Sequence, residues 1–514
     1  MAKEKHIKDL FGNLFKRATN SKDIVYSPNK YRETEGTKDS FSINHTTPYA
    51  CIALQEMNLA YHYPIVYWNT ACLSINAAAD EESENNKSTQ YGKVGVAIAK
   101  ALKEGINIKP PYINEAKFGF TPIAEDNSII YALKAMNGIG DEVSQAIIEN
   151  RPYTSMEDFA ERMLDTNLIK NSQMVKLIKG GCFDTLYSPD RFKTMEWYLR
   201  KYQYDPIGKL TLSQLGRAKE FGIIPAELDF CLKCIEFKKY VLDDEGLYEK
   251  WIDPAKSRIP KKGYHDGHYI LDEYTQQFFK ENFTEDSIVD VVNGYYVVSE
   301  KLFTKEIDSY IQPLKNWFMT FEAETSYNKA VWNEVWNRHA SGTEASWSME
   351  ALCYYDDKHE LADVDEKEYG IVNYFDLPVD PEPYEYYRRK IDNEWKVVPK
   401  YNISRIAGTV LNTDNSRHTI ALLTCYGVVN IKMYKESYAF YNKRISQIQS
   451  DGKKKVLEDS WLKRGNKLLI SGIRRDDQFF PLVYSDTIYK HTICLIKDIN
   501  QNGKLLLQTE RIKV

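Results

Sequence analysis

Two pairs of glycines in the first half of the chain occupy positions where backbone amides could bind phosphate. Gly138 and Gly140 flank Ile139 between two stretches of helical periodicity, and Gly180 and Gly181 follow another such stretch. Glycine tolerates positive φ and lets another backbone approach closely, and amides at a turn before a helix N-terminus attract anions. With Ile139 as an inward apolar pin, the pattern predicts helix-hairpin-helix motifs that bind DNA. An ordinary corner between two helices would have the same signature.

Lysine side chains next to these turns would add cationic contacts to the same phosphates. The candidates are Lys134, Lys176 and Lys179. Phosphate contacts fix the position of DNA without reading its bases. The sequence therefore predicts binding of duplex DNA without sequence preference.

A polar stripe on a helix predicted to start at Pro48 is a second candidate site. Thr47 and Pro48 form a favourable N-cap and first-turn pair. With helical spacing, one face of this helix carries Cys51, Gln55, Asn58 and His62. The apolar residues lie mostly elsewhere, and we expect them to pack in a core. The polar stripe could contact a ligand or could be plain solvent surface.

The C-terminal segment combines positive charge with the patterning of β-strands. Residues 400–514 carry a net charge of about +10, whereas the rest of the chain carries about −15. From Ser404 onward the apolar period shifts toward two, and a helical stretch follows the third expected strand. This order predicts an OB-type barrel over 403–485, a fold that often binds single strands. A final hairpin over 486–514 would turn at Asn502–Gly503.

The expected barrel has residues suited to single-stranded nucleic acid. Its candidate cations are Lys432, Lys435, Arg474 and Arg475, and its candidate stacking rings are Tyr426, Tyr434 and Phe479. Strand alternation places Val429, Ile431 and Met433 on one face, which we expect to be the core. Lys432 and Tyr434 would then face outward. In the alternative interpretation, the aromatic rings fill the core and the charges are solvated.

Metal-ligand patterns are scarce in this sequence. Cys231 and Cys234 form the only CxxC, in an apolar helical pattern without a second ligand pair, so we expect core cysteines. Asp363 and Asp365 resemble a paired-aspartate metal site but lie in an acidic, proline-containing stretch that we expect to be a linker. We expect no metal or cofactor to be bound by this chain itself.

Length and composition limit the remaining classes. The 514 residues are 43% hydrophobic and 27% charged, which suits several domains. No run of eighteen apolar residues exists, and the basic N-terminus lacks the apolar stretch of a secretory signal. Eight scattered cysteines indicate reduced thiols. We expect the cytoplasm as the location.

Three segments in a fixed order resemble one family. FSINHTTPYACIALQEMNLAYHYPIVYWNTACLS resembles a fingers segment of bacterial DNA polymerase III alpha subunits, with the pattern F-x-K-x-H-x-x-x-Y, then A-Y and H-Y-P. INIKPPYINEAKFGFTPI resembles the PPDIN loop that follows it there, and 131–187 resembles the tandem helix-hairpin-helix. The resemblance covers about 41–187, and the trailing barrel fits the family's arrangement. Residues 190–400 match no known segment, which indicates a divergent version encoded by a phage.

The resemblance implies template-directed DNA synthesis with two metal ions held by palm carboxylates. His45 matches a family histidine near the phosphates of the incoming nucleotide, and Tyr49 matches the tyrosine after it. Gln55 would lie on the same nucleotide-side fingers surface. Ile43 replaces a family lysine, which weakens a direct phosphate contact here, and His45 could instead cap the helix at Pro48.

In the family the palm precedes the segment found here. At most forty residues precede that segment in this chain, so we expect the palm, with its Mg²⁺, on a partner chain and no activity in this chain alone. The expected partners are primer–template duplex, single-stranded template and a palm-containing subunit. A sliding clamp would be a further family partner, but Asp9-Leu10-Phe11 has only the ending of a clamp-binding motif. The alternatives are a DNA-binding or processivity factor without catalysis, and a degenerate remnant.

The expected fold is a multidomain α+β protein: mostly helical fingers and helix-hairpin-helix regions, a helical or mixed middle region, and a C-terminal OB-type β-barrel. The expected segments are an N-terminal extension (1–40), fingers (41–125), tandem helix-hairpin-helix (126–190), a helical middle region (191–342), an acidic linker (343–402), the barrel (403–485) and the final hairpin (486–514).

Overall fold

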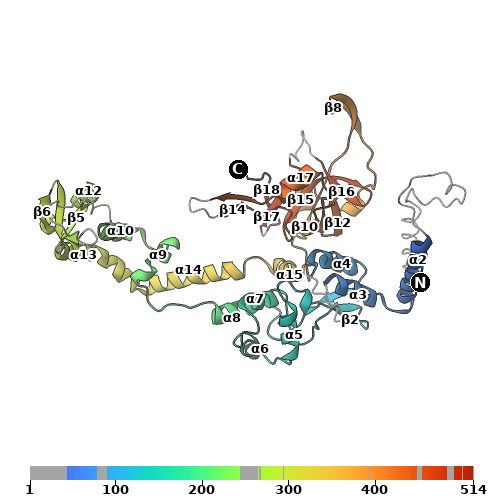
Figure 1. Cartoon of the computed structure of the whole chain (residues 1–514), viewed down its shortest axis with the longest axis horizontal. Coiled ribbons are helices and arrows are strands. Elements are labelled where there is room, and N and C mark those ends of the chain that lie inside the picture. Colours follow the sequence, from blue (N-terminus) through green and yellow to red (C-terminus); the bar gives the residue numbers. More distant parts are fainter. Residues whose placement is uncertain are drawn as a thin grey trace. The chain divides into compact units, whose positions relative to one another are not determined.

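A computed structural model describes most of the chain in two compact units. The described residues are 43–77, 89–243, 264–265, 268–271, 273–292, 294–391, 393–448, 454–482, 491–500 and 502–512. One unit comprises Met1–Met195 with Gly342–Val514, and the other comprises Glu196–Ser341 (Figure 1). The mixture of helices and sheets confirms the expected α+β class. No helix in the described ranges is long and apolar enough to span a membrane.

The first unit begins with three helices and a small sheet. These elements are α2 (Ile43–His62), α3 (Ile65–Ala77), α4 (Tyr91–Lys103), β1 (Asn107–Lys109), β2 (Thr121–Ile123) and β3 (Ser128–Ile130), with strand order β1-β3-β2. The helix expected to start at Pro48 begins at Ile43 instead. On the side of this helix that was expected to pack in a core, Tyr49 and Ile52 are exposed, whereas Ala53, Met57 and Ala60 are half-buried.

The helix-hairpin-helix region follows this sheet. Its elements are η2 (Leu133–Ala135), α5 (Asp141–Glu149), α6 (Met156–Met163), α7 (Asn171–Lys179) and the start of α8 (Arg191–Tyr202). The helix expected before the first glycine turn is only the short 3-10 turn η2, because Ala132 and Met136 on either side have extended backbones. Both flanking residues are buried, so packing rather than helix propensity sets this conformation.

The stretch 343–402 is folded rather than an open linker. It contains α15 (Glu344–Leu352), α16 (Glu366–Tyr369), η6 (Tyr374–Asp376), β8 (Glu385–Ile391) and β9 (Glu394–Lys400). Helix α15 packs against α7, and its Trp347 and Leu352 are fully buried. The prediction of a linker was therefore wrong for α15. It was based on the acidic composition of the stretch and overlooked the apolar face of this helix.

The C-terminal part forms a closed five-stranded barrel. Its strands are β10 (Ser404–Asp414), β11 (Thr419–Thr424), β12 (Gly427–Lys432), β15 (Lys467–Arg475) and β16 (Gln478–Pro481). The order β10-β11-β12-β16-β15 closes through a β10–β15 pairing, and β12 pairs with β16 in parallel. Helix α17 (Lys435–Asn442) connects the third and fourth barrel strands, as in the predicted OB type.

The barrel core follows the predicted alternation, and the predicted final hairpin is present. Val429, Ile431 and Met433 are buried in the core with Trp461. The final hairpin, β17 (Ile493–Ile499) and β18 (Leu505–Gln508), is present but joins β15 at the sheet edge. A separate ribbon is formed by β13 (Ile445–Ile448) and β14 (Lys454–Glu458).

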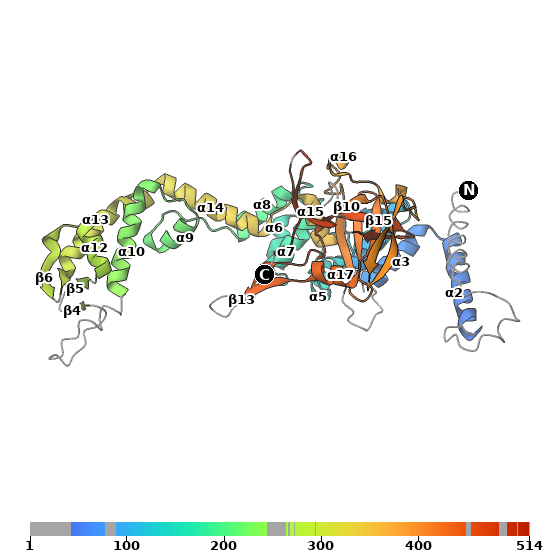
Figure 2. The ribbon, with the colours of Figure 1, turned by 90° about the horizontal axis from the view of Figure 1, so that it is seen from above.

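The second unit is mixed rather than helical throughout. Its helices are η3 (Leu212–Gln214), α9 (Leu215–Glu220), η4 (Ala226–Leu228), α10 (Asp229–Asp243), α12 (Glu273–Asn282), η5 (Glu285–Ser287), α13 (Glu300–Phe318) and α14 (Phe321–His339). Its sheet has the order β4 (Tyr264–His265), β5 (His268–Leu271), β7 (Tyr295–Ser299) and β6 (Ile288–Val292). Figure 2 shows α12 and α13 beside these strands. Cys231 and Cys234 are buried, as predicted for core cysteines.

Candidate nucleic-acid interface

The first glycine turn has the predicted inward pin and an open outer face. Gly138 has φ +86°, a conformation that favours glycine, while Ile139 is only 2% exposed. Gly138 and Gly140 are exposed, and a Cβ added at Gly140 would meet no atom within 4 Å. The Asn137 amide donates a 2.8 Å hydrogen bond to the Ala351 carbonyl. The turn is thus held from behind by α15 and faces solvent in front.

The amides at the start of α5 lie directly after this open turn. Gly140 is the N-cap and supplies no side-chain cap, so the first helical amides can donate hydrogen bonds to an anion from outside the chain. Asp141 and Glu142 in the first turn oppose a phosphate electrostatically. Lys134 forms an ion pair with Asp141, and burial lowers the pKa of Lys134 from its usual value. Lys134 therefore balances a nearby carboxylate, and the backbone carries the candidate phosphate contact.

The second glycine pair does not form an open turn. Gly180 and Gly181 are both buried. A Cβ at Gly180 would contact Leu352 of α15 at 3.3 Å, and a Cβ at Gly181 would collide with the side chains of Arg191 and Asp184. The expectation of a phosphate-binding turn here was wrong, because these glycines allow close packing of other segments.

The two lysines of α7 face a carboxylate within the chain. Lys179 Nζ lies 2.6 Å from Glu350 Oε2, and Lys176 pairs with the other oxygen of the same carboxylate. Burial by itself would raise the pKa of Glu350, but the hydrogen bonds from both lysines outweigh it and lower that pKa. The Lys179 side chain is only 8% exposed. These lysines join α7 to α15 and are not presented to DNA as expected.

A buried ion-pair cluster also connects the residues that follow α7 to α15. Arg191 binds Asp184 at 2.8 Å and also pairs with Asp356. Its guanidinium donates to the Ser348 hydroxyl at 2.8 Å. Burial raises the pKa of Asp184 to about 6, although Arg191 acts in the opposite direction. The cluster ties the segment after α7 to α15, so the rigid backing of the glycine turn comes from residues far apart in the sequence.

The outer surface of the first three barrel strands is covered by helices. Helix α4 crosses β10, β11 and β12, and a Cβ at Gly95 would lie 2.6 Å from the Cys353 carbonyl. Apolar contacts seal this junction between Val96 of α4, Met349 of α15, and Leu411 and Leu423 of the barrel. OB barrels bind oligonucleotides on the face of their second and third strands. In this chain, packing within the first unit occupies much of that face.

Some of the residues predicted to bind single-stranded DNA are exposed, and others contact groups within the chain. Tyr434 is 65% exposed and Lys435 is exposed, so both face outward as predicted. Arg475 is also exposed, 5.4 Å from the centre of the Tyr401 ring. Lys432 donates a hydrogen bond to the Arg417 carbonyl.

Three of the other barrel candidates have structural contacts instead. Arg474 donates to the carbonyl of Leu377 at 3.0 Å and stacks 4.7 Å from the Tyr374 ring centre. The Tyr426 hydroxyl donates to Glu366 at 2.9 Å. Phe479 is fully buried in the barrel core, so its proposed stacking on bases was wrong. This ring packs in the apolar core because its strand, β16, closes the barrel.

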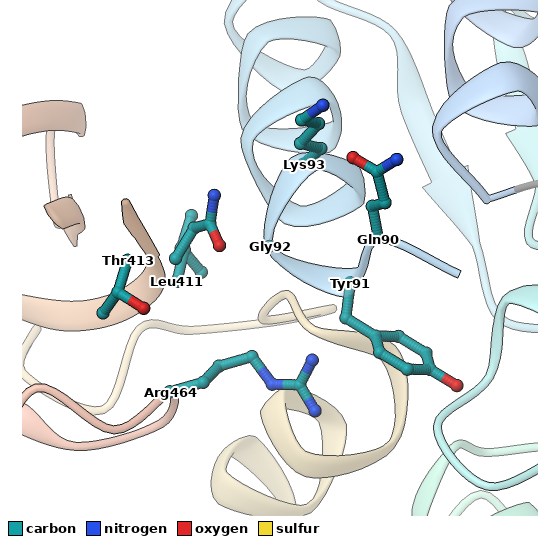
Figure 3. Close-up of a pocket in the computed structure, with 8 residues that line it drawn as sticks. Gln90, Tyr91, Gly92, Lys93, Leu411, Thr413 and Arg464 are labelled. Carbon is teal, nitrogen blue, oxygen red and sulfur yellow. The ribbon is translucent and has the colours of Figure 1, made fainter. Parts of the chain in front are cut away.

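A pocket that the sequence did not reveal opens between α4 and the barrel (Figure 3). Its volume is about 340 Å³, and its lining consists of Gln90, Tyr91, Gly92, Lys93, Leu411, Asn412, Thr413 and Arg464. The Arg464 guanidinium lies 4.7 Å from the Tyr91 ring centre. The lining contains two cations and no carboxylate, which suits an anionic group. No sequence signal indicated it, because the pocket depends on how α4 packs against β10.

The remaining candidates from the sequence lie on exposed or capping positions. Tyr49 and Gln55 are exposed on α2, and His45 is in the same helix, but its side chain lies outside the described residues. Asp365 caps α16 through the Lys367 amide at 3.0 Å. Asp363 pairs with Lys358. In the described ranges, no group of three His, Cys, Asp or Glu side chains could hold a metal ion.

A glycine turn backed by helices and a closed OB-type barrel are modules of proteins that bind nucleic acids. A family model described as a helix-hairpin-helix motif matches residues 105–193. "Probable DNA polymerase YorL" of Bacillus subtilis and the "DNA-directed DNA polymerase" of Bacillus phage SPbeta are each 39% identical over 483 residues. The "DNA polymerase III subunit alpha" of Treponema pallidum is 25% identical over 279 residues, 51% of this chain and 22% of that protein.

Over the matched residues, the chain is similar to phage DNA polymerases and to the alpha subunits of bacterial DNA polymerase III. The first two matches cover 92% of this chain but only 35% of each relative. The chain therefore spans about a third of the length of these curated relatives.

Proposed function

We propose that this chain supplies fingers-side and DNA-binding elements for template-directed DNA synthesis. The observation that carries the proposal is the open turn at Gly138–Gly140, which lies within the matched helix-hairpin-helix segment. Backbone amides there would bind a phosphate of the primer–template duplex. Because such contacts ignore the bases, binding would be independent of sequence. This role would operate in the cytoplasm of a bacterial host.

Nucleotidyl transfer in this function uses two metal ions held by carboxylates. We assign those carboxylates, with their Mg²⁺, to a palm on another chain. The exposed apolar side chains of α2 support further protein contacts near the fingers, since Tyr49, Leu54 and Tyr61 are all more than half exposed. A sliding clamp is a further partner that such an assembly would use.

Primer extension tests the catalytic part of the proposal. We expect the purified chain to leave a primer unextended in Mg²⁺, and a palm-containing polymerase chain to extend it when the two are mixed. If the complete assembly extends primers equally well without this chain, the alternative of a non-enzymatic DNA-binding or processivity factor is favoured. Incorporation by this chain alone, lost on Asp363→Asn, would overturn the assignment of the palm to another chain.

Duplex binding tests the glycine turn. Gly140→Val places a side chain in the open space before the amides and should weaken duplex binding by about tenfold, the loss of one charge-assisted contact of about 1.4 kcal/mol. Gly208→Val is the matched control, because a Cβ there also meets no atom within 4 Å and the residue lies in the second unit. Wild-type affinity should fall steeply with salt. Equal binding by a folded Gly140→Val variant and its control would refute the turn as the phosphate site.

A further inference from the structure

The ribbon of β8 and β9 is an exposed two-stranded sheet with both faces largely uncovered. It projects from the barrel in Figure 1, and all seven residues pair in register from Glu385↔Lys400 to Ile391↔Glu394. An isolated two-stranded ribbon is at best marginally stable in water and contributes little to a core. Its side chains are therefore available for contacts outside the chain.

The register sorts the ribbon's side chains into two chemically different faces. Directly opposed residues lie on one face. One face, here called the cation–aromatic face, carries three pairs: Tyr386 with Pro399, Arg388 with Val397, and Lys390 with Trp395. The opposite face carries the carboxylates of Glu385 and Glu394 together with Arg389 and Lys396. The cation–aromatic face has no carboxylate among its described residues.

The cation–aromatic face is strongly exposed despite its large rings. Trp395 is 70% exposed and Tyr386 is 64% exposed. Arg388 and Lys390 are exposed as well. At about 3.4 Å per residue, the two rings are separated by about 14 Å along the ribbon. Arg388 lies between them, and Lys390 lies directly opposite Trp395. Exposed rings beside exposed cations form a surface complementary to a polyanion with stackable bases.

We propose that the cation–aromatic face binds single-stranded DNA, with bases stacked on Trp395 and Tyr386 and phosphates paired to Arg388 and Lys390. This inference rests on the proposed function in DNA synthesis and names a site for the template strand. The charge and the rings favour nucleic acid over an apolar protein surface, which would leave both cations unpaired. Because α4 and α15 cover much of the outer face of β10–β12, the ribbon offers a more accessible surface for a single strand.

Two double variants of the full chain test the two faces of the ribbon separately, and each variant removes the same amount of positive charge. Arg388→Ala with Lys390→Ala should weaken binding to labelled oligo-dT at about 50 mM salt by at least about tenfold and flatten its salt dependence. Arg389→Ala with Lys396→Ala removes the same charge from the opposite face and should change the affinity by less than about threefold. Equal losses in both variants would overturn the assignment.

The aromatic contacts and the duplex site give independent readouts. Trp395→Ala should weaken oligo-dT binding by about tenfold, whereas duplex binding that depends on Gly140 should be unchanged. If Tyr434→Ala on the barrel weakens oligo-dT binding more than Trp395→Ala does, the barrel holds the strand and the ribbon proposal is wrong. If the wild-type chain did not bind duplex DNA at all, that result would instead count against the proposed function itself.

Discussion

The junction between α15 and the barrel should weaken when the pH falls, because the segment after α15 contains a partly buried, neutral histidine. His359 Nε2 lies 3.0 Å from the Leu423 carbonyl, and Nδ1 lies 3.0 Å from the Leu361 amide. A backbone amide can only donate, so Nδ1 must accept and the proton resides on Nε2. Burial lowers the pKa of His359 from 6.5 to about 4. Protonation would break the hydrogen bond from Leu361.

The sign and size of the effect follow from this shift. Because the folded pKa lies below the unfolded one, the unfolded chain takes up the proton first as the pH falls. The stabilisation is complete above pH 6.5 and is lost as the pH falls toward 4. The full loss is about 3 kcal/mol, and about 2 kcal/mol is lost by pH 5. The neighbouring charges are Glu360, which raises this pKa, and Lys467, which lowers it; these two groups pair at 2.9 Å.

Urea unfolding from pH 7 to pH 5 tests this expectation, with hydrogen exchange in β11 as a local probe. His359→Gln removes the titrating group and should lose about 2 kcal/mol less than the wild type over this range. His62→Gln, on the exposed end of α2, is the control and should follow the wild type. Parallel pH profiles for His359→Gln and the wild type would refute the argument.

Two further substitutions test the packing of the first unit. Glu350→Gln removes the negative charge between Lys176 and Lys179 and should lower the free energy of unfolding in urea by about 1–2 kcal/mol. This loss is smaller than that for a fully buried ion pair because Glu350 is 42% exposed. An unchanged urea midpoint would show that the ion pair is not coupled to folding. Phe479→Ala should cost about 3–5 kcal/mol by opening a cavity in the barrel, whereas Tyr434→Ala should stay within about 0.5 kcal/mol; comparable losses would contradict the inward and outward placement of these rings.

Local sequence determined those features whose cause lies within a few residues. Glycine is favoured at position 138 because the turn adopts positive φ there. Ile139, the residue between the two glycines, is large and apolar, so it points inward. The alternation in β12 placed Ile431 in the core and Lys432 outside it. Strand and turn residues also predicted the barrel and the final hairpin. In each case backbone geometry and a two-residue or helical period set the outcome.

Only the tertiary structure decided which of the candidate side chains remain available. Lys179 and Gly180 have the composition of a phosphate site, but α15, from far along the chain, covers them. From the sequence alone Phe479 could be an exposed stacking ring, but in the structure it lies in the core of the barrel that β16 closes. The acidic composition of 343–402 likewise concealed a helix that packs against α7 and an exposed basic ribbon. Burial depends on which distant segments meet, and a one-dimensional pattern does not contain that information.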